Sequence, residues 1–253
     1  MSKTRHTPHP PTGRRLLDAG ASIDAHRHDG HQLVYAGRGV VEVITEAGAW
    51  VAPASRALWI PAGTVHAHRA HGPTELRLVG LAPTERTALD EPGAGWERPA
   101  VVAVTGLLRE LILAYSGEAD LPGGERERLR GVLVDRLRRA PGQPVHVPAA
   151  RDPRLAAVCR LVRDDPADPR GLRELGRAVG AGERTLARLF RGEFGMGFRQ
   201  WRTQVRLHRA VVLLAEGVPV TSVAVRCGWS SPSAFIEVFR KAFGHTPGRA
   251  FTV

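Results

Sequence analysis

The sequence VAVRCGWSSPSAFIEVFRKAFGHTPGR, residues 223–249, predicts two short helices joined by a turn. The first helix would bury one apolar face, formed by Val220, Val223, Ala224 and Cys227. Gly228 can then adopt the left-handed conformation that ends a helix. Ser231 offers a capping hydroxyl and Pro232 suits the first position of a helix, so we expect the second helix to begin there.

The second predicted helix has one apolar and one polar face. Phe235, Phe239 and Phe243 recur every four residues and would point inward. The outward positions would be Ser233, Ala234, Glu237, Arg240 and Lys241. A helix, a glycine-containing turn and a second helix with a polar outer face form the arrangement that a reader of the DNA major groove requires.

The same pattern occurs once more, earlier in the chain. Leu172, Leu175 and Gly180 recur 48 residues on as Val220, Val223 and Gly228, and Phe190, Phe194 and Gly195 recur 49 residues on as Phe239, Phe243 and Gly244. The helix after Gly180 would expose Glu183, Arg184, Ala187, Arg188 and Arg191. A single amphipathic helix pair is commonly core packing, so it is the repetition that favours two helix-turn-helix units.

Residues 198–215 lie between the two units and contain neither proline nor glycine, which predicts one continuous helix. A helix of this length is about 27 Å long. Successive major-groove segments on one face of DNA lie about 34 Å apart, so such a spacer could present both units to one duplex.

Most of the net charge of +11 belongs to the C-terminal part of the chain. Residues 1–148 carry 18 Lys/Arg and 16 Asp/Glu, a net +2, whereas residues 149–253 carry 18 Lys/Arg and 9 Asp/Glu, a net +9. An arginine-rich solvated surface is one interpretation of this excess. Combined with the two predicted units, it favours double-stranded DNA as the partner.

These residues resemble the AraC/XylS family of bacterial transcription regulators over about residues 152–251. The strongest match is Val223-Ala224-x3-Gly228-Trp229-Ser230-Ser231-x3-Phe235-x3-Phe239-Arg240-Lys241-x-Phe243-Gly244-x2-Pro247-x-Arg249. The resemblance implies that the first unit reads bases through Arg184 and Arg188, and the second through Pro232, Ser233, Ala234 and Glu237. Arginine suits guanine and glutamate can accept from cytosine, whereas proline and alanine offer only apolar contact. We therefore expect the first unit to contribute more than the second unit to the discrimination between DNA sequences.

Several further arginines are expected to face phosphates or solvent rather than bases: Arg199, Arg202, Arg206, Arg209 and Arg240.

Short runs of β-branched and aromatic residues between turn residues predict an antiparallel sheet, closed into a barrel or sandwich, over about residues 15–103. The clearest runs are Gln32–Ala36, Gly39–Thr45, Ala57–Ile60 and Glu75–Val79. Helical spacing follows in residues 104–116 and 124–139, with a break at Leu121-Pro122-Gly123-Gly124.

Two histidine-containing motifs in the predicted sheet resemble those of the cupin barrel. They are His26-x-His28-x3-Gln32-x6-Gly39 and Pro61-x-Gly63-x2-His66. The resemblance implies a divalent metal held by His26, His28 and His66, with Gln32 where metal-binding cupins have glutamate. Imidazole suits zinc, copper, iron or nickel, and alternate residues of one strand face the same side. Two alternatives stay open: a small-molecule cavity without a metal, or no ligand role. Tyr35, Trp59 and His68 would line such a pocket, although Tyr35 and Trp59 could instead belong to the barrel core.

The predicted fold class is a two-domain α+β protein, with an N-terminal cupin-like β-barrel and following helices, and a C-terminal all-α double helix-turn-helix domain. The expected boundaries are 1–103 for the barrel, 104–140 for the helices, 141–151 for a proline-rich linker and 152–253 for the DNA-binding domain. The resemblance implies that the helices at 104–140 form a homodimer. Their apolar stripe could equally pack on the barrel, and it consists of Leu107, Leu111, Leu129, Leu133 and Leu137.

The chain shows no apolar signal core and no apolar run of membrane-spanning length, so we expect a cytoplasmic protein without a membrane partner. Two cysteines, Cys159 and Cys227, are too few for a disulfide framework. We expect a transcription regulator, activator or repressor, whose barrel senses a small molecule or metal ion, with RNA polymerase as a further candidate partner.

Two other functions remain as alternatives to a regulator. The first is a cupin-type metalloenzyme tethered to nucleic acid. Gln32 in place of an acidic ligand argues against it, as does the lack of a nucleophile–base or paired-carboxylate motif. The second is an architectural DNA binder, which would leave the histidine-rich barrel unexplained. We therefore predict no enzymatic activity.

Overall fold

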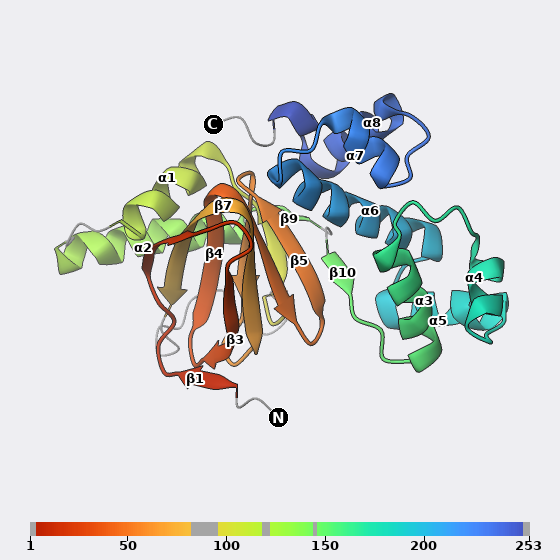
Figure 1. Ribbon diagram of the computed structural model, residues 1–253. Coiled ribbons are helices and arrows are strands. Elements are labelled where there is room, and N and C mark those ends of the chain that lie inside the picture. Colours follow the sequence, from red (N-terminus) through yellow and green to blue (C-terminus); the bar gives the residue numbers. More distant parts are fainter. Residues whose placement is uncertain (1–3, 82–95, 118–121, 144–145, 250–253) are drawn as a thin grey trace. The chain divides into compact units, whose positions relative to one another are not determined.

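The structure is a computed structural model that describes residues 4–81, 96–117, 122–143 and 146–249 (Figure 1). Its backbone contacts divide the chain at about residue 145 into two compact units, one rich in strands and one helical. This agrees with the predicted two-domain α+β class. Leu121 of the predicted helix break, and Pro144 and Val145 of the predicted linker, lie outside the described residues.

The N-terminal unit is built on one large sheet. Its strands are β1 (Arg5–Thr7), β2 (Gly13–Leu17), β3 (Ser22–His28), β4 (His31–Thr45), β5 (Gly48–Pro53), β6 (Arg56–Ile60), β7 (His66–Leu81), β8 (Ala100–Ala103) and β9 (Gly142–Gln143). The hydrogen-bonded order is β1-β3-β7-β4-β6-β8-β9, with β2 also paired to β7 and β5 to β4.

One detail of the predicted barrel is wrong. Among the described strands the pairing starts at β1 and ends at β9, so the sheet curls without closing on itself. β1, which precedes the region predicted as antiparallel, pairs with β3 in parallel. The other strand pairs of this unit whose register is determined are antiparallel, as predicted. The long strand β7 explains the curl, since its early residues pair with β3 and its later residues with β2.

Strand β4 joins two runs that the sequence predicted separately. Its pairing with β7 shifts register on both sides of Arg38, which marks a bulge. Gly39 has a φ of +78°, and a Cβ there would lie 2.5 Å from the carbonyl oxygen of Pro73. The bulge therefore bends a continuous strand where the sequence suggested a break.

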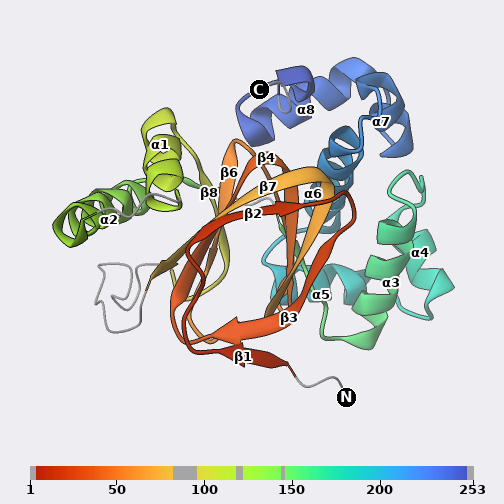
Figure 2. The same ribbon diagram turned by 60° about the vertical axis from the view of Figure 1, so that its left-hand side comes forward.

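The alternation of side chains along β4 produces two separate cores. Leu33 and Tyr35 face the helices α1 (Gly106–Tyr115) and α2 (Gly123–Arg138), whereas Val34 and Ala36 face the other side of the sheet. Figure 2 shows α1 and α2 together on one side of the sheet.

The helices predicted at 104–116 and 124–139 are confirmed as α1 and α2. Much of their leucine stripe packs on the sheet, because Leu111, Leu133 and Leu137 are buried in the core beneath them. Leu107, in contrast, stays 49% exposed.

The C-terminal unit contains β10 (His146–Pro148), α3 (Pro153–Asp164), α4 (Leu172–Ala178), α5 (Glu183–Phe194), α6 (Phe198–Ala215), α7 (Val220–Arg226), α8 (Pro232–Phe243) and a 3-10 turn (Pro247–Arg249). Helices α4 and α7 have the same length and start 48 residues apart, and α5 and α8 have the same length and start 49 residues apart. Gly180 and Gly228 adopt φ of +68° and +75°. The predicted repeat of two helix-turn-helix units, and the continuous helix between them, are confirmed.

The segment predicted as a linker contains two short strands. Gly142 and Gln143 pair with β8 at the edge of the N-terminal sheet, and Val147 is buried in the C-terminal core. Its prolines prevent a helix but allow extended edge pairing, which is why composition alone suggested a linker. Among the described residues, no helix has the length and apolarity of a membrane span.

Candidate nucleic-acid interface and histidine cluster

Helix α5 carries a basic outer face. Leu186 and Phe190 anchor the helix in the core, which turns the opposite side of the helix to solvent. One shallow depression on that side is lined by Arg184, Thr185, Ala187, Arg188, Arg191 and Gly192. The three arginines form no ion pair with any described residue, and all are exposed. Their guanidinium groups are therefore available to an external anion or base edge.

Helix α8 presents a less polar outer face. The Ser231 hydroxyl caps the helix by accepting from the Ala234 amide at 3.2 Å, as predicted, and Pro232 occupies the first turn. The three phenylalanines of α8 are buried. Pro232, Ser233, Glu237 and Arg240 are exposed and Ala234 is half-buried. The residues of α8 that were predicted to contact DNA thus lie on the outer face of the helix. In the first turn of that face, the one side-chain hydroxyl is that of Ser233.

The structure corrects the prediction for two arginines of helix α6. Arg202 and Arg206 were expected to face phosphates or solvent, but both are half-buried and donate to backbone carbonyls of the loop between α3 and α4. Burial lowers the pKa of both guanidinium groups. Arg199, Arg209 and Arg240 are exposed.

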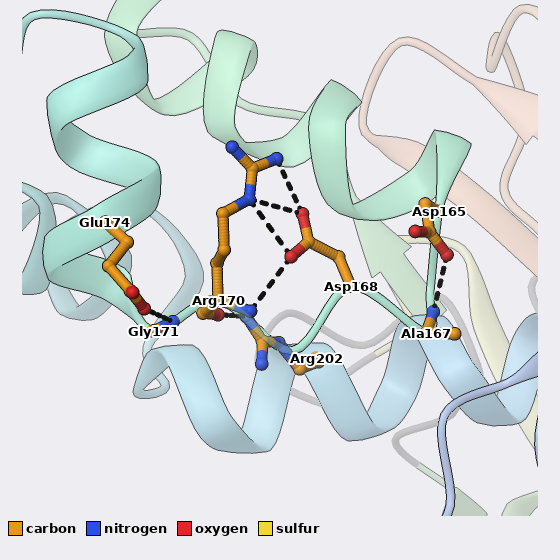
Figure 3. Close-up of polar contacts among 7 residues, drawn as sticks. All are labelled: Asp165, Ala167, Asp168, Arg170, Gly171, Glu174 and Arg202. Carbon is orange, nitrogen blue, oxygen red and sulfur yellow. Dashed lines mark hydrogen bonds and ion pairs between the residues drawn. The ribbon is translucent and has the colours of Figure 1, made fainter.

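The loop between α3 and α4 is held by a polar frame that the sequence reading missed (Figure 3). Asp168 accepts from the Arg170 side chain at 2.7 Å and from its amide at 2.9 Å, and these bonds lower the pKa of Asp168. Glu174 accepts from the Gly171 amide at 2.8 Å, which caps α4. Arg202 reaches the Arg170 carbonyl from α6. A glutamate three residues after a glycine N-cap was the available signal.

Three histidines of the N-terminal unit converge. His26 and His28 lie on β3, and the antiparallel pairing places His26 opposite His66 of β7. One ring nitrogen of each lies within 4.8 Å of the others, so the predicted triad is brought together.

The hydrogen bonds of the triad set its chemistry. In each ring Nδ1 contacts a backbone carbonyl two residues away: His26 to Asp24 at 2.8 Å, His28 to Gly30 at 2.7 Å, and His66 to Thr64 at 2.8 Å. A carbonyl oxygen only accepts, so Nδ1 must carry the hydrogen and Nε2 of a neutral ring carries the lone pair. Burial lowers the pKa of His28, and lowers that of His66 to about 4. The Nε2 atoms of His28 and His66 are buried without a hydrogen-bond partner among the described residues. The triad therefore fits a divalent transition metal.

His68 and Gln32 lie beside this triad. The His68 ring centroid is 5.1 Å from that of His66, and burial lowers the His68 pKa well below 6.5. Gln32 is fully buried, and its carboxamide is close enough to His28 to influence the pKa of that ring. The carboxamide atoms of Gln32 have no hydrogen-bond partner within the described part of the chain.

The predicted ligand pocket does not form as one site. Tyr35 and Trp59 belong to the core beneath α1 and α2, whereas His68 lies with the triad. Trp59 is fully buried and donates through Nε1 to the Trp96 carbonyl at 2.8 Å. The cause is the two-residue alternation of a strand, since Gln32 and Tyr35 are three residues apart and face opposite sides of β4.

Comparison with known proteins gives two family models, a helix-turn-helix domain at residues 175–252 and a cupin domain at residues 13–81. The transcriptional regulator NimR of Escherichia coli is 32% identical over 226 residues, which cover 88% of this chain and 80% of that protein. The chain belongs to the AraC family of transcription regulators. Its N-terminal part is a cupin domain, as the histidine motifs predicted.

Other relatives match a smaller share of the chain. The regulator RipA of Corynebacterium glutamicum is 35% identical over 109 residues, 43% of this chain and 32% of that protein. An AraC-type regulator structure from Chromobacterium violaceum is 27% identical, with a TM-score of 0.37, and covers 39% of this chain and 88% of that one. The prediction of a DNA-binding regulator rather than an enzyme is confirmed by the relatives.

Proposed function

We propose that α5 and α8 are the two base-reading helices and that α6 holds them against successive major-groove segments of one duplex. The observation that carries this proposal is the repeat of α4–α5 as α7–α8, with polar outer faces on both second helices. Selecting bound duplexes from a random pool with the full chain tests it. We expect two conserved segments about one helical turn apart. A single short segment would contradict the proposal.

Helix α5 is proposed to supply most of the sequence discrimination. Its outer face carries planar guanidinium groups, each able to donate two hydrogen bonds to the acceptor edge of guanine. They belong to Arg184, Arg188 and Arg191. Ala187 lies between them and can contact a thymine methyl group. On α8, Pro232 and Ala234 can make only apolar contacts, leaving Ser233 and Glu237 for hydrogen bonds and Arg240 for phosphate.

The triad of His26, His28 and His66 is proposed to bind a divalent transition metal in the cupin domain. Three imidazoles whose Nδ1 atoms are fixed by backbone carbonyls support this assignment. Gln32 would be a weak neutral fourth ligand. A bound ion would add positive charge and join β3 to β7.

Elemental analysis of protein purified without an affinity tag tests the metal. We expect close to one equivalent in the wild type and none in His66→Ala, whereas His31→Ala should keep the metal because His31 stacks on Trp59 at 4.9 Å, outside the triad. Less than a tenth of an equivalent of any transition metal in the wild type would refute the assignment. A small-molecule cavity would then be the remaining sensor role.

We further propose that occupation of the cupin domain, by the metal or by a small molecule, changes DNA affinity. Such coupling requires that the effector bind one arrangement of the chain more tightly than another. Measuring the affinity for the selected duplex before and after metal removal tests it. Equal affinities in the two states would rule out the metal as an effector. Whether DNA binding activates or represses, and whether it recruits RNA polymerase, follows from transcription assays on the same duplex.

A homodimer is proposed through α1 and α2. The support is the exposure of two large apolar side chains there, Leu107 at 49% and Val132 at 44%. Light scattering of the full chain at micromolar concentration should give twice the 27.4 kDa mass of the chain. A monomeric mass would refute this part of the proposal.

A further inference from the structure

Arg206 of α6 contacts parts of both helix-turn-helix units. Its Nε donates to the Pro166 carbonyl at 3.0 Å, in the loop that leads into α4 of the first unit. Its guanidinium also lies over the ring of Trp229, at 5.7 Å from the centroid, in the turn between α7 and α8 of the second unit. One side chain on the spacer helix α6 therefore contacts both units.

The backbones of the two units also approach each other beside Arg206. A Cβ placed on Gly228 would lie 2.7 Å from the Ala167 Cα and 2.7 Å from the Arg206 Nη2. The equivalent residue of the first unit, Gly180, has no atom within 4 Å of such a Cβ. Gly228 thus serves both the left-handed turn and the close packing of the two units.

The spacer helix holds the same loop at a second point, one turn earlier. Arg202 donates to the Arg170 carbonyl, next to the frame that Asp168 and Glu174 build at the start of α4. Arg202 and Arg206 thus both tie the first unit to α6, in addition to the core that Trp201 and Val205 of α6 share with that unit. Only Arg206 also reaches the second unit through Trp229.

We propose that Arg206 is a positioning residue that locks the two helix-turn-helix units into one rigid reader. The lock sets the distance and phase between α5 and α8 before DNA is bound, so the second unit engages at high effective concentration once the first has bound. It also makes the protein intolerant of altered spacing between its two DNA segments. The DNA part of this inference rests on the proposed two-segment reading, whereas the rigidity of the unit does not.

The variant Arg206→Met tests the lock, because methionine keeps the aliphatic stem and removes the guanidinium. Arg209→Met is the matched control, since Arg209 lies on the same helix and is exposed. Both variants lose one positive charge, so a general electrostatic effect on DNA binding would be equal in the two.

The rigidity is measured first without DNA. Spin labels at the exposed positions Arg177 of α4 and Lys241 of α8 report the distance between the units. Both native thiols are buried, and burial raises the pKa of Cys159 to about 12 and that of Cys227 to about 11, so they should resist labelling. We expect a narrow distance distribution in the wild type and in Arg209→Met, and a broad one in Arg206→Met.

The consequence is then measured on DNA with the selected duplex and with a copy carrying one extra base pair between the two segments. We expect the insertion to weaken binding by the wild type and Arg209→Met at least about tenfold, and binding by Arg206→Met less than about threefold. A phosphate contact would instead lower affinity for both duplexes equally and reduce the salt dependence.

Equal distance distributions in Arg206→Met and Arg209→Met would overturn the proposal, whatever the DNA result. If Arg206→Met does not fold, Arg206→Lys is read in the same way, because lysine keeps the charge but lacks the planar fork. In Arg206→Met, a broad distance distribution together with the wild-type loss of affinity for the duplex with one extra base pair would support the rigid connection of the units. It would reject the role of that connection in DNA recognition. Failure of the selection experiment to give two segments would reject the two-segment function alone.

Discussion

Replacing Arg188 with alanine should weaken DNA recognition without weakening the fold. The side chain is exposed on the outer face of α5 and forms no ion pair within the described residues, so the free energy of unfolding should change by less than about 0.5 kcal/mol. A bidentate arginine–guanine contact is worth about 1–3 kcal/mol of discrimination against the wrong base. At about 1.4 kcal/mol per tenfold, this predicts a loss of roughly five- to 150-fold on the matched site.

Ser233 gives the comparison on the second unit. Its single hydroxyl makes at most one neutral hydrogen bond to a base, with a net value of about 0.5–1.5 kcal/mol. Ser233→Ala should therefore cost less affinity and less specificity than Arg188→Ala. Arg177→Ala is the charge control, because Arg177 is exposed on α4 rather than on a reading helix.

The assay is competition binding with the selected duplex and with each of its single-base variants, at several salt concentrations. In Arg188→Ala, discrimination should relax at one base pair, while the salt slope stays near that of the wild type. If Arg188→Ala instead weakens all sequences equally and lowers the slope by about 0.9, the residue contacts phosphate. A larger loss of specificity in Ser233→Ala would refute the proposed asymmetry between the two units.

Three further outcomes are expected. His66→Ala should lose the metal measured by elemental analysis, whereas His31→Ala should keep it; metal retained by His66→Ala would move the site elsewhere. Gly180→Ala should lower the unfolding free energy by about 1 kcal/mol, because its left-handed φ disfavours a side chain. Gly228→Ala should lower it by about 1–3 kcal/mol more, because its Cβ would also clash with Ala167. Equal losses of unfolding free energy in chemical denaturation would contradict the close approach of the units. Hydrogen bonding to Arg154 lowers the pKa of the Asp152 carboxyl from 3.8 to about 2. The ionised Asp152 carboxylate should therefore stabilise the fold fully above about pH 4, and this stabilisation should disappear as the pH falls to about 2. Thermal unfolding of Asp152→Asn should lack this part of the acid sensitivity.

The helical part of the fold could be predicted because its signals are local. The Ser231 cap, the left-handed glycines and the four-residue spacing of the phenylalanines each act within one or two turns of helix. Their 48- and 49-residue recurrence then fixed the two units without any knowledge of packing. Strand alternation places His26 and His28 on one side of β3, whereas His66 was joined to them only through the resemblance to the two cupin motifs.

The rest depends on contacts between residues far apart in the sequence. Arg202 and Arg206 have the composition of a solvated helix face, and only the folded loop between α3 and α4 shows them to be half-buried hydrogen-bond donors. The sequence left open whether Tyr35 and Trp59 belong to the barrel core or to a cavity wall, and only the pairing of β4 with β6 and the packing of α1 and α2 place both in the core.

Hydroxyl-radical footprinting of the full chain on its selected duplex tests the paired reading of DNA most directly. We expect two protected windows on one face of the helix, about 10–10.5 base pairs apart from centre to centre. Combined Arg184→Ala and Arg188→Ala substitutions should remove one window and leave the other. A single window in the wild type, or two windows on opposite faces, would show that α5 and α8 do not engage the duplex together.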